Sequence, residues 1–318
     1  MKKWIAGLLA LTLALSMAAC GGKEEKSGSL KDAVNHTAAV EPSEEKPREK
    51  PQDKPQEKPK EDTAAADLSM EPVVVLDNDQ CTVKFTDIRE DEDFGLMLRC
   101  FCENKSQDTT YMFTIDDGSV NGIDCDPFFA SELGPGKKSN EEIYFWVEDL
   151  KALGVTDFTD IWVAFRVYDS DDYLAEPVGL KEQHIYPRGP ENAARYRREL
   201  QPDDVVLMDT DEGLVAVVGS GMDEIWGYSL SLYIENRTDT CVMFSADDVS
   251  VNGYMVDPFF ARSLPADTCA YEQIVWPLEE LEKNGIGQVE EIEFILDVYD
   301  NENWDLPDFL EKPVTYRP

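Results

Sequence analysis

Two stretches of the chain alternate between apolar and polar positions with a period of two. In residues 161–168 and 292–299, every second side chain is a large aliphatic or aromatic one. A period of two places alternate side chains on one face, so both stretches are predicted to be β-strands with one buried face. Short helices are predicted at 148–153 and 278–284, each ended by a glycine. The pattern therefore predicts an all-β fold with one short helix per copy of a repeated unit.

The unit is repeated once. Residues 112–130 and 243–261 are identical at 13 of 19 positions, and similarity extends along the chain on both sides. We define the first repeat as residues 70–188 and the second repeat as residues 203–318, each near the length of an immunoglobulin-like sandwich. The predicted architecture is two tandem immunoglobulin-like β-sandwich domains of seven or eight strands each.

One motif recurs almost unchanged in both repeats. It contains an Asn-Gly pair between β-forming residues, which predicts a hairpin because both turn residues need positive φ. It continues into Asp-Pro-Phe-Phe, which we interpret as a core anchor that closes one end of the sandwich. The motif residues are Asn121, Gly122, Asp126, Phe128 and Phe129 in the first repeat and Asn252, Gly253, Asp257, Phe259 and Phe260 in the second.

Differences between the repeats are a better guide to function than what they share. Trp162 stands on the non-core face where the second repeat has Glu293, and Arg166 stands where it has Asp297. Together they form a candidate aromatic and basic binding patch. The alternative is that this face packs on a neighbouring strand or on the linker.

The linker at residues 189–202 is predicted to be helical, with Pro190 at its start. Arg195, Arg197 and Arg198 form a basic cluster in an acidic body. We favour a bridging role between the two acidic repeats over a binding role, because like-charged neighbours need a counter-charge nearby.

The N-terminus has the order of a secretory signal. Residues 1–19 run from lysines through an apolar stretch to small residues before Cys20. We expect cleavage before Cys20 and lipidation of its thiol, the alternative being an ordinary signal peptide with a coincidental cysteine. Residues 20–69 are rich in Lys, Glu and Pro and are predicted to be a disordered stalk. The expected location is the extracellular face of the cell membrane, where the lipid holds the chain.

The charge is strongly negative, with 66 acidic and 29 basic residues and a formal net charge of −37. Such a surface repels nucleic acid and anionic headgroups, so no nucleic-acid partner is expected. It suits cations or a basic partner, although a solvated exported surface also explains it.

Few residues are available for catalysis. The only histidines are His36 and His184, and no Gly-rich phosphate loop, GxSxG elbow or HExxH motif occurs. Histidine-based nucleophilic catalysis and His-rich metal sites are therefore not expected. A carboxylate pair of the glycosidase kind remains as a basis for an enzyme.

The cysteines leave two alternatives open. Cys100, Cys102 and Cys125 align with apolar residues of the second repeat, which favours a packing role. A disulfide within the first repeat, among Cys81 and these three, or between Cys241 and Cys269 in the second, is the alternative.

Acidic clusters suggest calcium sites as one interpretation. The candidate ligands are Asp169, Asp171, Asp172, Asp300 and Glu302. Because Asp and Asn are also the usual residues of turns, turn chemistry is the favoured interpretation. No other metal or cofactor is expected.

With these features together, the chain resembles immunoglobulin-like lipoproteins of Gram-positive bacteria that carry the VNG hairpin. The resemblance covers the N-terminal anchor and residues 70–318, and it rests on the ENx[ST], DDxSVNG and DPFFA motifs. It implies the fold and the location and no catalytic residues.

The leading hypothesis is an envelope-anchored binding or scaffolding module without catalytic activity, whose partner is an envelope protein or glycan. A carboxylate-based, glycan-directed envelope hydrolase is the alternative from another class. A calcium-stabilised structural surface protein is the third.

Overall fold

The structure is a computed structural model that describes residues 68–318, apart from residues 92–94, 126, 224, 259 and 304. The predicted signal peptide, Cys20, the stalk up to residue 67 and His36 lie outside the described residues, as do Asp126 and Phe259 of the recurring motif.

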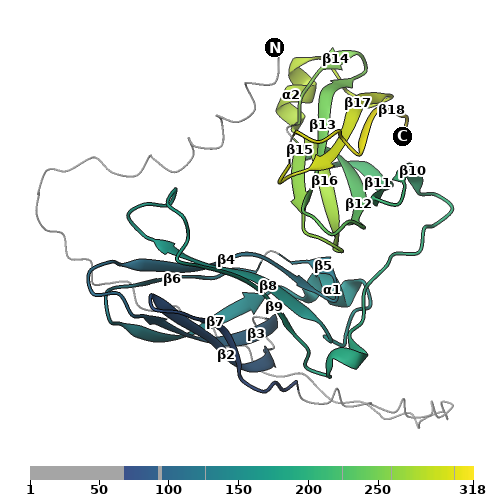
Figure 1. Cartoon of the computed structure of the whole chain (residues 1–318). Helices are drawn as coiled ribbons and strands as arrows, with labels where there is room; N and C mark the ends of the chain where they lie inside the picture. Colours follow the sequence, from purple (N-terminus) through teal and green to yellow (C-terminus); the bar gives the residue numbers. More distant parts are fainter. Residues whose placement is uncertain (1–67, 92–94, 126, 224, 259, 304) are drawn as a thin grey trace, which may run out of the picture. The chain divides into compact units, whose positions relative to one another are not determined.

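The first repeat contains nine strands and one short α-helix among its described residues (Figure 1). Their bounds are β1 Val73–Asp77, β2 Cys81–Asp91, β3 Gly95–Asn104, β4 Tyr111–Val120, β5 Ile123–Asp124, β6 Ala130–Leu133, β7 Lys138–Phe145, α1 Glu148–Ala152, β8 Ile161–Asp169 and β9 Gly179–Ile185.

The second repeat has the same order of elements in its described part (Figure 1). Their bounds are β10 Val205–Asp209, β11 Gly213–Asp223, β12 Gly227–Asn236, β13 Val242–Val251, β14 Tyr254–Met255, β15 Phe260–Leu264, β16 Cys269–Trp276, α2 Leu278–Lys283, β17 Ile292–Asp300 and β18 Leu310–Tyr316. The count exceeds the seven or eight strands expected, partly because β5 and β14 are two-residue strands that close the Asn-Gly hairpins.

Both repeats pair their strands alike. The order β1-β2-β3-β7 corresponds to β10-β11-β12-β16, and β4-β8-β9 corresponds to β13-β17-β18, all antiparallel. A parallel bridge between Cys269 of β16 and Ile123 of β5 links strands of the two repeats. The predicted all-β fold is confirmed.

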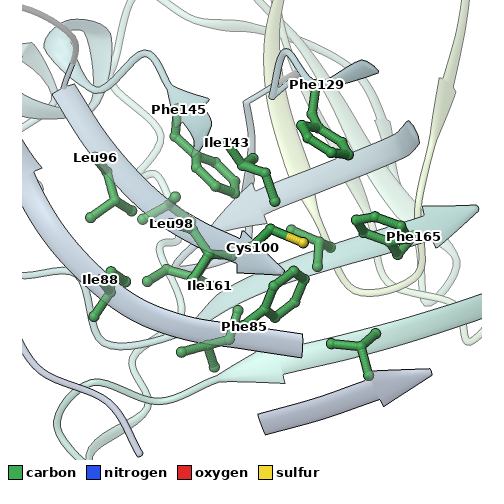
Figure 2. Packing of buried hydrophobic residues seen from close by; sticks show 14 of the residues in the cluster. Phe85, Ile88, Leu96, Leu98, Cys100, Phe129, Ile143, Phe145, Ile161 and Phe165 are labelled. Carbon is green, nitrogen blue, oxygen red and sulfur yellow. The ribbon is translucent and has the colours of Figure 1, made fainter. Parts of the chain in front are cut away.

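Alternation along the strands builds the hydrophobic core. In Figure 2, apolar side chains of β2, β3 and β7 face those of β8. The ring of Phe165 lies 6.1 Å from that of Phe85 and 5.6 Å from that of Phe129, measured between centroids. Burying a side chain of this size contributes roughly 1.5–3 kcal/mol. A second cluster in the second repeat includes Phe244 and Trp276, both fully buried.

The Asn-Gly turns have the predicted conformation. Asn121 and Gly122 have φ of 51° and 78°, and Asn252 and Gly253 have φ of 50° and 79°. The Asn121 side chain also ties the hairpin to the segment before β8, because its Oδ1 accepts from the backbone N–H groups of Thr159 and Asp160 at 2.9 and 3.0 Å.

Asn252 makes the equivalent contacts before β17, since its Oδ1 accepts from the N–H groups of Glu290 and Glu291. The recurring asparagine therefore has a structural role in both repeats.

Both predicted helices are present. Gly154 and Gly285 follow them with φ of 81° and 71°, the left-handed conformation that commonly ends a helix. No helix in the described part of the chain is long and apolar enough to cross a membrane.

The prediction that Phe128 anchors the core is wrong. Phe129 is 8% exposed, whereas Phe128 is 74% exposed. The backbone N–H of Phe128 donates to the carbonyl of Tyr144 in an isolated β-bridge, so the chain is extended here. Successive side chains of an extended chain point to opposite faces, so only one of the two rings can face the core.

The predicted linker helix is also wrong. Only Pro190–Asn192 form a 3-10 turn, and the rest of the linker has no helical structure. Tertiary contacts satisfy its backbone: the N–H of Ala194 donates to Thr159 Oγ1 at 2.9 Å, and that of Tyr196 donates to the carbonyl of Asn121 at 2.8 Å. These bonds replace those that a helix would make internally.

Candidate functional site

A groove of about 720 Å³ lies over one face of the sheet formed by β4, β8 and β9. Its floor consists of Asp117, Ser119, Trp162, Ala164, Glu182 and His184. Residues 237–241, residues 265–268, Arg195 and Glu302 complete the lining. The volume falls within the range of roughly 300–1,000 Å³ that is common for ligand pockets.

The strand register places three floor residues in one row. Ser119 of β4 pairs with Trp162 of β8, which pairs with His184 of β9. Directly paired residues of antiparallel strands project to the same face. The indole therefore lies between a hydroxyl and an imidazole.

Ser119 is the unusual member of this row. The residue is 1% exposed, and its hydroxyl has no hydrogen-bond partner among the described residues. A buried hydroxyl without a partner costs about 1–3 kcal/mol, so native structures rarely keep one without a reason.

The second repeat satisfies the corresponding serine internally. Ser250 pairs with Glu293, and its hydroxyl lies 3.5 Å from Glu293 Oε2. Trp162 occupies the place of Glu293 in the first repeat. The same substitution that brings an aromatic ring to the groove floor thus removes the acceptor for Ser119.

His184 is held by a buried carboxylate. Its Nδ1 lies 2.7 Å from Oδ1 of Asp160, which is 3% exposed. Arg195 Nη2 lies 3.6 Å from the other oxygen of Asp160, and its Nε lies 3.3 Å from Asp267 Oδ2. This network fixes the imidazole and one guanidinium group in the lining of the groove.

Of the linker arginines, Arg195 bridges the repeats as predicted, whereas Arg197 and Arg198 pair with carboxylates of the second repeat. Arg195 pairs with carboxylates of both repeats, as above, and Arg197 lies 3.0 Å from Glu235 and 2.6 Å from Asp267. Arg198 forms an ion pair with Asp204.

The structure separates the two members of the predicted binding patch. Trp162 lines the groove, whereas the guanidinium of Arg166 lies over the rings of Tyr168 and Tyr173, 4.8 and 4.7 Å from their centroids. Arg166 also lies 3.9 Å from Asp116. Its guanidinium is thus occupied by neighbours of its own repeat.

The candidate calcium ligands make turn contacts. Asp169 Oδ1 accepts from the N–H of Asp171 at 3.0 Å, and Asp300 Oδ1 accepts from the N–H of Glu302 at 2.8 Å. The latter hydrogen bond is the main reason why the pKa of Asp300 lies below its usual value. Within the described part of the chain, no three or more side chains, those of Asp172 and its neighbours included, are grouped so that they could hold a metal ion.

The six described cysteines are not joined by disulfides. Cys100 and Cys102 are fully buried with their sulfurs 3.5 Å apart, a hydrogen-bond distance. The hydrogen bond with Cys102, together with burial, raises the pKa of Cys100 well above its usual value. Burial also raises the pKa of Cys81, to about 11.

Sequence reasoning missed the roles of Ser119, Asp160 and His184. The three residues come from different parts of the chain. The β4, β8 and β9 register brings Ser119 and His184 to either side of Trp162, and the contact with His184 adds Asp160. The available signal was the exchange of Trp162 for Glu293 beside a serine common to both repeats.

Comparison with known proteins adds little. No protein-family model matches the chain, and no curated protein matches it. Among solved structures it is similar to red sea bream transglutaminase at 11% identity, with a TM-score of 0.21. The alignment covers 78% of this chain and 31% of that one, so the chain spans about a third of that enzyme's length. A TM-score this low gives no basis for assigning fold or activity.

Proposed function

We propose that the chain is an exported, lipid-anchored binding module in which two immunoglobulin-like domains display the groove at the cell surface. The signal sequence, Cys20 and the hydrophilic stalk support the location, and the equivalent strand pairing of the repeats supports the tandem arrangement. The binding role rests on one observation, the buried hydroxyl of Ser119 that lines the groove without a partner among the described residues.

Binding is favoured over catalysis by the same geometry. A nucleophilic serine needs a base within hydrogen-bond reach. Within the described part of the chain the Ser119 hydroxyl has no such neighbour, and the imidazole of His184 is bonded to Asp160 instead. An incoming ligand would supply the missing partner for Ser119.

Capture from a cell-envelope extract tests the proposed function. The wild-type chain is compared with Trp162→Glu, which gives the first repeat the residue of the second, and with Glu293→Gln, a control at the equivalent position outside the groove. We expect Trp162→Glu to capture at least tenfold less material than the wild type. Glu293→Gln should capture as much as the wild type. Equal capture by all three proteins would show that the groove is not the binding site.

The location is tested separately. Mass spectrometry of the protein from its native membrane should find a lipid-modified Cys20 at the new N-terminus, and Cys20→Ser should release the protein into the medium. An unmodified Cys20 would refute the anchor.

A further inference from the structure

We infer that the groove binds a positively charged peptide segment, with a lysine or arginine side chain over Trp162 and its charge facing the groove carboxylates. This inference rests on the proposed function and names the class of its ligand.

The first argument is the charge of the lining. Five carboxylates and two guanidinium groups line the groove, which gives a net charge of −3 with His184 neutral. Both guanidinium groups already have acidic partners. Arg195 pairs with Asp160 and Asp267, and Arg237 lies 2.8 Å from Asp209 and 3.2 Å from Glu235.

Three of the lining carboxylates have no basic partner within the described residues. They are Glu182, Asp239 and Glu302, and all three are exposed. Glu182 belongs to the floor, and the other two belong to the remaining lining. An anionic ligand would meet repulsion from these groups, whereas a cation would be attracted. The surplus charge therefore favours an ammonium or guanidinium group.

The second argument is the aromatic floor. Trp162 is partly exposed and lines the groove among these carboxylates. Tryptophan offers the most favourable ring face for a cation, and the aliphatic stem of lysine or arginine also packs on apolar surface. An aromatic face beside acidic groups suits such a side chain on both counts.

The third argument is the hydroxyl of Ser119. It is the direct cross-strand neighbour of Trp162, and it is buried without a partner among the described residues. A hydroxyl oxygen accepts hydrogen bonds, and an ammonium group offers three donors. A lysine side chain on the indole would meet this acceptor.

The charge of the whole chain acts in the same direction. A net charge of −37 attracts basic ligands at long range and makes their association sensitive to salt. Because several of the carboxylates are exposed, we expect moderate affinity that falls as ionic strength rises.

Calorimetric titration of the full-length protein with a lysine pentapeptide tests the inference. We expect saturable binding with one peptide per chain, and an affinity at least fivefold lower at 200 mM than at 20 mM NaCl. A glutamate pentapeptide and a neutral N-acetylglucosamine tetramer should give no binding heat.

Variants connect the binding to the groove. Trp162→Leu and the double change Glu182→Gln with Glu302→Gln should each weaken lysine-peptide binding about tenfold. Ser119→Ala should weaken it about threefold without lowering the melting temperature. Glu279→Gln, which removes one exposed negative charge from α2, should change the affinity less than twofold.

Three results would overturn the inference. If all variants bind the lysine peptide equally, the attraction is non-specific. If the sugar tetramer binds in a Trp162-dependent way and the lysine peptide does not bind, the groove is a glycan site. The proposed binding function would then hold, but the inference of a basic peptide ligand would be wrong. If neither ligand binds and extract capture is also independent of Trp162, both proposals fail together.

Discussion

At the scale of single residues, two equivalent serines occupy opposite situations. Ser250 has Glu293 as a neighbour for its hydroxyl, whereas Ser119 has Trp162 beside it and no partner among the described residues. The same position of the two repeats therefore differs in whether its buried hydroxyl has a hydrogen-bond partner.

This contrast predicts opposite effects of one substitution. Ser119→Ala removes a hydroxyl whose burial is uncompensated, so the free energy of unfolding should stay unchanged or rise by about 0.5 kcal/mol. Ser250→Ala removes a hydrogen-bonding group, so the free energy of unfolding should fall by about 0.5 kcal/mol. Urea denaturation of both variants measures the difference, and a clear loss of stability in Ser119→Ala would mean that its hydroxyl is satisfied in the native protein.

A second prediction at this scale concerns acid. The pKa of Asp300 is lowered from about 3.8, mainly by the backbone N–H of Glu302. A carboxyl whose folded pKa is depressed stabilises the fold above its unfolded pKa, and this contribution disappears as pH falls through the folded value.

Asp300→Asn keeps an oxygen acceptor but cannot ionise. The wild type should therefore be more stable than the variant at pH 6, and the gap should shrink as pH falls below the ordinary Asp value of 3.8 through the lower folded pKa. Thermal melts of both proteins between pH 2 and 6 measure it. A gap that stays constant over this range would contradict an ionised, hydrogen-bonded Asp300.

At the scale of elements, the β11–β12 hairpin depends on a glycine. Gly227 has φ of 97°, and a Cβ there would lie 2.1 Å from the carbonyl oxygen of Trp276. Gly253 has a similar φ of 79°, but no atom lies within 4 Å of its Cβ position.

The two glycines separate backbone strain from steric clash. Gly253→Ala should cost about 1 kcal/mol, the usual penalty of a left-handed alanine. Gly227→Ala should cost at least about 3 kcal/mol, because the strands must also move apart. Chemical denaturation measures the free energy of unfolding of both variants. Equal decreases would mean that the β12 and β16 backbones lie further apart than the structure describes.

Element prediction from the sequence succeeded where local signals decide the structure. Alternation predicted β8 and β17, and the Asn-Gly pairs predicted the hairpins at Asn121 and Asn252 because positive φ is a local requirement. The linker failed because its helical composition was overridden by bonds to Thr159 and Asn121, which are distant in sequence.

The groove was only partly predictable for the same reason. Trp162 was identified because the second repeat has Glu293 at the equivalent position. Its neighbours in the groove were not identified, since cross-strand register is set by tertiary structure. Arg166 was grouped with Trp162 because both stand on one face of β8. Its actual partners include Tyr173, which lies beyond the end of that strand.

At the scale of the whole molecule, buried charge connects the repeats. Arg262 of β15 lies 2.6 Å from Asp124 of β5, whose side chain is 1% exposed. Removing the cation from a buried pair costs about 3–5 kcal/mol, since an uncompensated charge remains.

Arg262→Met should therefore lower the free energy of unfolding by about 3 kcal/mol. Arg317→Met is the matched control, because Arg317 pairs with Glu291 at an exposed site and should cost less than about 1 kcal/mol. Differential scanning calorimetry compares the two. Similar small losses would show that Asp124 is solvated in solution.

The entry of the chain into its first strand has a mechanical consequence. Leu68 and Met70 pack against the first hydrophobic cluster, and β1 follows at the edge of its sheet, where β2 is its one partner among the described strands. With Cys20 fixed to a membrane as proposed, any pull between cell and partner reaches the fold through this edge. The hydrogen bonds between β1 and β2 would then be the first strand pairing of the folded part to bear that load.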